Sequence, residues 1–90
     1  MLKANKEFQI IPGVGKSLSR DIVDLGYKKI NELKDENPEV MYQNLMDLRD
    51  EQIDRCVLYV FRCAVYYASN TTHEPELLKW WNWKDEKQKI

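Results

Sequence analysis

The chain has 90 residues, which is enough for one hydrophobic core and too few for a second. Hydrophobic residues make up 43% of it, and 14 basic residues nearly balance 15 acidic ones, giving a net charge of -1. This composition argues against a disordered chain, and the lack of a basic excess argues against a strong non-specific nucleic-acid binder. No apolar stretch approaches the roughly 20 residues of a membrane span, and the first residues do not resemble a secretory signal, so a cytoplasmic protein is expected.

Apolar residues recur at spacings of three and four, and no segment alternates apolar and polar residues as a half-buried strand does. We therefore expect one all-α domain of about five helices over residues 1–83, followed by a solvated tail over residues 84–90. The first helix is expected over residues 2–11. Pro12 should end it, because proline restricts the preceding residue and lacks an amide donor.

A second helix is expected over residues 16–25, ended by Gly26 in a left-handed conformation. A single connecting turn around Ile30 and Leu33 should follow. Between residues 12 and 34 five basic residues face three acidic ones, so any basic face on this half of the chain is small.

Asn37-Pro38-Glu39 predicts the start of the next helix, since it combines a capping side chain, a proline in the first turn and an acidic residue near the positive end. Met41, Leu45 and Leu48 supply the buried stripe of this helix. The longest helix is expected over residues 51–69. It is apolar nearly all round, so we expect it at the centre of the bundle, in contact with every other helix.

Pro75 predicts the start of a last short helix, with Leu77, Leu78 and Trp81 facing the core. Three tryptophans fall within four residues here, more than one short helix can bury on one side, so at least one ring should be partly exposed. Trp81 is expected to close the core, whereas Trp80 or Trp83 is a candidate for a partner surface.

Cys56 and Cys63 lie two helical turns apart, too far for a disulfide within one helix, so both should be free thiols. His73 is the only histidine and is expected to be solvated, which leaves too few ligands for a zinc site. Asp21 and Asp24 are interpreted as solvent-facing carboxylates. No spacing indicates a catalytic group or a cofactor, so a non-enzymatic protein is expected.

Residues 11–34 contain a hydrophobe, Pro-Gly-Val-Gly, an amphipathic helix, a glycine and further hydrophobes, and this order resembles the helix-hairpin-helix motif. The resemblance implies a compact, SAM-like helical bundle in which amides at the second glycine and just after it bind a phosphate. The physics supports such a site, because unpaired first-turn amides and the helix dipole attract anions. The predicted nucleic-acid-binding residues are Gly13, Val14, Gly15, Lys16, Ser17 and Arg20.

These modules often occur in pairs, and the expected second hairpin is the turn at residues 48–51. It has no glycine, and Asp50 and Glu51 would repel phosphate, so we interpret it as degenerate and structural. Ser17 stands where many DNA-binding versions carry a lysine. Binding to DNA or RNA is therefore expected to be weak.

Residues 54–67 and 78–83 extend the resemblance along most of the chain. They are similar to a small bacterial family of pathogenicity-locus or mitomycin-resistance-like proteins. That resemblance implies the fold and a DNA-related role, and it carries no established activity.

The leading hypothesis is a module that binds the nucleic-acid backbone without sequence preference, since amide and lysine contacts carry no base information. The alternative is a protein-interaction module that uses the tryptophans or a stripe along the longest helix. That stripe consists of Arg55, Tyr59, Arg62 and Tyr66. It is interpreted as either a binding surface or, more simply, the solvated face that a buried helix needs. The sequence does not indicate an oligomeric state.

Overall fold

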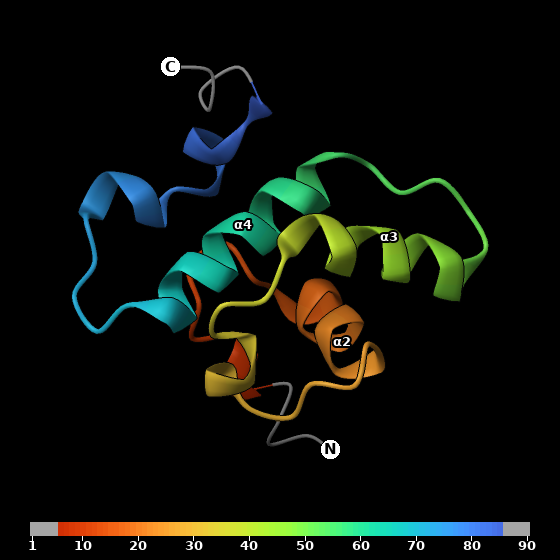
Figure 1. Cartoon of the computed structure of the whole chain (residues 1–90), viewed down its shortest axis with the longest axis horizontal. Helices are drawn as coiled ribbons and strands as arrows, with labels where there is room; N and C mark the ends of the chain where they lie inside the picture. The colour runs from red at the N-terminus through yellow and green to blue at the C-terminus, as the bar shows by residue number, and fades with distance from the viewer. Residues whose placement is uncertain (1–5, 86–90) are drawn as a thin grey trace.

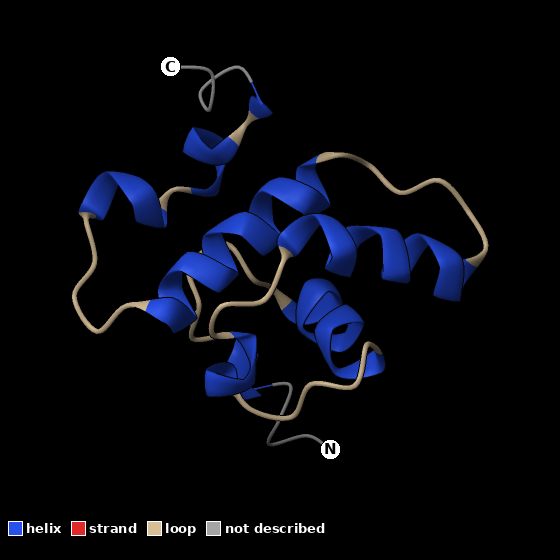
Figure 2. Cartoon of the chain, viewed as in Figure 1, coloured by secondary structure: helices blue, strands red, loops and turns tan. Residues whose placement is uncertain are grey.

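The computed structural model describes residues 6–85, and this part of the chain contains helices, turns and loops but no strand (Figure 2). The expectation of an all-α fold is confirmed. None of the helices in residues 6–85 is long and apolar enough to cross a membrane.

The chain enters through a helical turn at residues 6–8 and reaches helix α2, Lys16–Asp24, through a tight turn. The first helix was expected to continue to Ile11 but ends earlier, where the amides of Ile10 and Ile11 bond to carbonyls only three residues back. Pro12 explains this, because it disfavours helical geometry at the residue before it. Residues 2–5 of that expected helix lie outside the described residues.

Local signals determine where the next elements begin and end. Gly26, at φ +106°, ends α2 in the left-handed conformation, as expected. A 3-10 turn, η1 (Ile30–Leu33), leads to α3 (Pro38–Arg49), whose first turn is capped by the Asn37 side chain accepting from the amides of residues 39 and 40. Leu48 was expected to be buried but is 52% exposed, because the helix end projects beyond the core.

The longest helix, α4, spans Cys56–Ser69 and begins five residues later than expected. Two contacts hold the preceding loop, residues 50–55, in a non-helical path. The Tyr42 hydroxyl donates to the carbonyl of Ile53, and an Asp54 carboxylate oxygen accepts from the Cys56 amide at 3.0 Å. The carboxylates at residues 50 and 51 therefore lie outside the helix.

Helix α4 crosses the middle of the molecule, as Figure 1 shows, and packs against α3 and all three 3-10 turns. Helix α2 has no comparably extensive contact with α4 and reaches the same core through Ile22. The expected central position is therefore confirmed, although contact with α2 is less extensive than expected. The fully buried large side chains of this core include Phe8, Ile11, Ile22, Leu33, Met41, Leu45, Leu58 and Phe61.

The expected last helix is instead two 3-10 turns, η2 (Pro75–Leu78) and η3 (Trp80–Trp83), separated by Lys79 in an extended conformation. This break reverses the roles expected for two tryptophans. Trp80 packs against the core, whereas Trp81 is 47% exposed.

The described chain ends at Asp85, which is not a solvated tail residue as expected. It is partly buried and forms ion pairs with Arg55 and Arg62. Residues 86–90 of the expected tail lie outside the described residues.

Both cysteines are free, as expected. Cys63 is fully buried, and its sulfur lies 3.6 Å from the carbonyl oxygens of Leu77 and Leu78. Burial raises the pKa of the Cys63 thiol to about 11. Cys63 therefore helps to pack η2 against α4.

Candidate functional site

The glycine hairpin joins the first helical turn to α2. Gly13 has φ +89°, a conformation that favours glycine, whereas Gly15 has an extended backbone and forms the N-cap of α2. Both glycines are exposed, but the Val14 side chain points inward and is only 5% exposed. Val14 therefore anchors the hairpin, and only its backbone remains available to a ligand.

The first turn of α2 presents amides to solvent. The earliest bond of the helical ladder runs from the Ser19 amide to the Gly15 carbonyl at 2.9 Å, so the amides of residues 16–18 precede it. The N-cap is a glycine and thus offers no side-chain acceptor, and the first turn carries no acidic residue. Such a helix start favours an anion through its free donors and its dipole.

Ser19 holds this helix start in place, a role that the sequence analysis did not assign. Its side chain is fully buried, and its hydroxyl donates to the Lys16 carbonyl at 2.8 Å. The same oxygen lies 3.5 Å from the Gln9 amide nitrogen in the preceding turn. A serine that bonds back along its own helix is a common local pattern, but its burial becomes visible only in the fold.

Lys16, Ser17 and Arg20 are exposed around the same helix start. Within residues 6–85 neither Lys16 nor Arg20 forms an ion pair, whereas Arg49, Arg55 and Arg62 all do. Lys16 and Arg20 therefore lie close to the exposed amides, and no carboxylate in the described part of the chain pairs with either of them.

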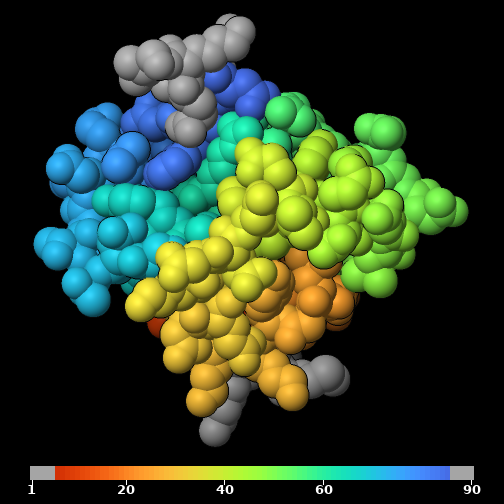
Figure 3. All heavy atoms as spheres, in the orientation of Figure 1, coloured from red at the N-terminus to blue at the C-terminus, as the bar shows by residue number. Residues whose placement is uncertain are grey.

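Helix α3 contributes a basic residue that neutralises the acidic side chains of α2. Its last residue, Arg49, pairs with Asp21 at 2.6 Å and with Asp24 at 2.8 Å. The interpretation of these aspartates as solvent-facing is therefore wrong for Asp21, whose side chain is 18% exposed, whereas Asp24 is exposed and also ion-paired. The hydrogen bond that Arg49 donates to Asp21, followed by the one that it donates to Asp24, raises the pKa of Arg49. On the face shown in Figure 3, α2 in orange and α3 in green border one another.

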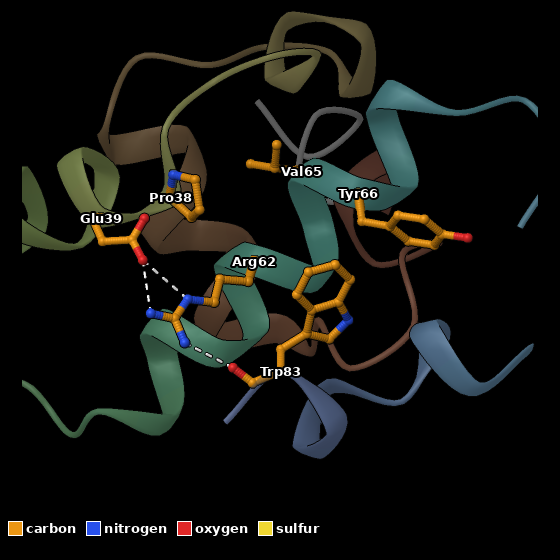
Figure 4. A pocket seen from close by; sticks show the side chains of 6 residues that line it. All are labelled: Pro38, Glu39, Arg62, Val65, Tyr66 and Trp83. Carbon is orange, nitrogen blue, oxygen red and sulfur yellow. Dashed lines mark hydrogen bonds and ion pairs between the residues drawn. The ribbon is translucent and has the colours of Figure 1, made fainter. Parts of the chain in front are cut away.

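The stripe along α4 binds the chain's own C-terminal segment, residues 80–85. Arg62 is central: its guanidinium pairs with Glu39 at 2.7 Å and with Asp85 at 2.9 Å, and donates to the Trp83 carbonyl at 2.8 Å (Figure 4). Arg55 pairs with Asp85 at 2.6 Å. The simpler interpretation of the stripe as a solvated face holds for Arg55, whose side chain is 53% exposed, and is wrong for the rest, because the C-terminal segment lies against it.

The aromatic members of this region also have intramolecular partners. The Tyr66 ring lies 5.5 Å from the Trp83 ring, and its hydroxyl accepts from the Glu74 amide at 2.7 Å. His73 was expected to be solvated but is half-buried, stacks on Tyr67 at 4.5 Å and contacts the Tyr67 carbonyl through Nε2 at 2.8 Å. In residues 6–85 no three metal-ligating side chains are grouped together.

An open hollow of about 320 Å³ lies between the start of α3, α4 and the C-terminal segment (Figure 4). Its walls are largely apolar and aromatic, and its polar edge is the ion pair between Arg62 and Glu39. Because the Arg62 guanidinium already has protein partners on three sides, the hollow lacks a free charged group. It is lined by Pro38, Glu39, Arg62, Val65, Tyr66 and Trp83.

The ion pairs from Arg55 and Arg62 to Asp85 clamp the C-terminal segment onto α4, and this clamp predicts an acid transition. The hydrogen bond from Arg55, assisted by Arg62, lowers the pKa of Asp85 from the ordinary 3.8 to about 2. A lowered pKa in the folded state stabilises the clamp above pH 4, and this contribution is lost as the pH falls from about 4 to 2. We expect tryptophan fluorescence to change in this window, as Trp83 leaves Tyr66.

The matched control is Asp85→Asn, which cannot titrate there. Its fluorescence should be nearly constant over the same window at equal salt. A transition of unchanged size in Asp85→Asn would assign the acid response to another carboxylate.

The fold and site together define a small all-helical protein whose exposed features are a glycine hairpin at a helix start and an aromatic C-terminal segment. The chain matches the family model Cdd1, described as pathogenicity locus, over residues 2–89, so it belongs to this family. It is also 26% identical over 77 residues to the mitomycin resistance protein McrB of Streptomyces lavendulae. This match covers 86% of the present chain and 70% of McrB. No solved structure matches it.

Proposed function

We propose that this protein is a non-enzymatic module that binds the nucleic-acid backbone without sequence preference through the Gly13–Gly15 hairpin. The observation that carries the proposal is the start of α2, where exposed amides lack a side-chain cap and the nearby Lys16 and Arg20 lack ion-pair partners within residues 6–85. A phosphate fits both the donors and the charge.

Arg49 supplies further support. It pairs with Asp21 and Asp24, the two carboxylates of α2, the helix that the hairpin starts. The repulsion that these carboxylates would exert on a phosphate is therefore reduced. With so few cations, affinity is expected to be weak and strongly dependent on salt.

The test is fluorescence anisotropy with labelled oligonucleotides of unrelated sequence at two salt concentrations. Gly15→Val should abolish binding because its branched side chain obstructs the amides. It should still fold, because Gly15 is extended and a Cβ there meets nothing within 4 Å. Lys16→Ala should weaken binding equally on every sequence and flatten the salt slope by about one.

The control for these variants is Asp50→Ala, which should do little or help slightly. If folded Gly15→Val and Lys16→Ala proteins bind like the parent, the hairpin is not the site.

The alternative is a protein-interaction module. The exposed Trp81 favours it, whereas the arginines and tyrosines of α4 already contact residues of the chain itself. The absence of any nucleic-acid binding at low salt would favour this alternative.

A further inference from the structure

The aromatic C-terminal segment meets the glycine hairpin, although the two are far apart in the sequence. A Cβ placed on Gly13 would lie only 3.0 Å from Cδ1 of Trp80, so the edge of the Trp80 ring lies close beside Gly13 while the glycine itself stays exposed. Trp80 is itself half-buried against the core. The hairpin and the segment that begins at Trp80 therefore form one continuous surface.

Trp81 extends this surface into solvent. Its ring meets the Trp80 ring edge-on at 5.8 Å and 84°, which is the only ring contact that it makes within residues 6–85. The neighbouring Trp83 differs, since its indole N–H donates to the Leu77 carbonyl at 2.8 Å. Trp81 is thus a large, exposed ring packed against the half-buried Trp80, which itself lies beside Gly13.

We propose that Trp81 stacks on an unpaired nucleobase, so that the preferred ligand is single-stranded nucleic acid. This inference rests on the proposed backbone site at the hairpin. A nucleotide whose phosphate lies at the helix start extends its base sideways, and an exposed indole accepts any base because every base has a π-face. In a duplex the bases are stacked inside and are not free to meet the ring.

The test compares three unlabelled competitors of equal length at low salt: single-stranded DNA, the same strand with abasic sites, and the duplex. The parent should prefer the intact single strand by about tenfold over the other two, the size expected for loss of one stacked base. Trp81→Ala should lose that preference and bind all three alike. Trp81→Phe should restore most of it.

Val40→Ala is the control, because Val40 is 52% exposed in the first turn of α3, at the opposite end of that helix from Arg49, and should not alter any of the three affinities. Circular dichroism should show that Trp81→Ala is folded. If the parent binds intact and abasic strands equally, or if Trp81→Ala keeps the preference, stacking is wrong while the backbone site stands. If the parent binds none of the three, the proposed function itself fails.

Discussion

Phe61→Ala is expected to lower the free energy of unfolding by about 3–5 kcal/mol. Phe61 is fully buried on α4, the helix that packs against α3 and the three 3-10 turns, so truncation leaves a cavity that no single neighbour can fill. A domain of this size has only about 5–13 kcal/mol of stability. The variant should therefore unfold at much lower urea concentration, as measured by circular dichroism.

Ile10→Ala provides the control, because it also truncates a large apolar side chain to alanine, at a position that is 63% exposed. Its unfolding free energy should change by less than about 0.5 kcal/mol. A loss below about 1 kcal/mol in Phe61→Ala would contradict the central position of α4.

Gly13→Ala is expected to cost about 2 kcal/mol of stability for two reasons. At φ +89° a side chain strains the backbone, and its Cβ would lie 3.0 Å from Trp80. Gly15→Ala makes the same chemical change two residues later at an extended N-cap with open space, where a cost of at most about 1 kcal/mol is expected.

Urea unfolding of the two glycine variants measures this difference. Repeating Gly13→Ala in a Trp80→Ala background should recover the steric part of the cost and leave the backbone part. Equal stability of Gly13→Ala and Gly15→Ala would show that the hairpin tolerates a side chain at either glycine. The two glycine positions also separate an effect on folding from an effect on binding. A side chain at Gly15 should leave the protein folded, so a loss of binding there reports on the site, whereas a side chain at Gly13 also lowers stability.

Much of the fold follows from signals that lie within a few residues of one another. Asn37 and Pro38 start α3, and Gly26 ends α2, because a cap or a left-handed glycine acts on its own turn. The apolar stripe of α4 likewise predicts its burial from its own sequence. The start of α4 was misplaced by five residues, since the Tyr42 contact that holds the preceding loop comes from another helix.

The candidate site likewise has one part that local sequence predicts and another that depends on tertiary packing. The exposed amides of the hairpin follow from Gly13, Gly15 and the helix after them, and this part was predicted. The packing of Trp80 on Gly13, which leaves Trp81 in solvent, joins segments more than sixty residues apart and was missed. Three tryptophans so close together indicate that one is exposed, but the pattern does not identify which.

The sequence by itself therefore determined the helical class, the positions of α2 and α3, the free cysteines and the glycine hairpin, because propensity, capping and periodicity act locally. Only the tertiary structure decided which charges remain free. Arg49 reaches Asp21 across 28 residues, and Arg62 reaches Glu39 across 23. Ion pairs of this kind depend on how helices pack, and no spacing along the chain specifies them.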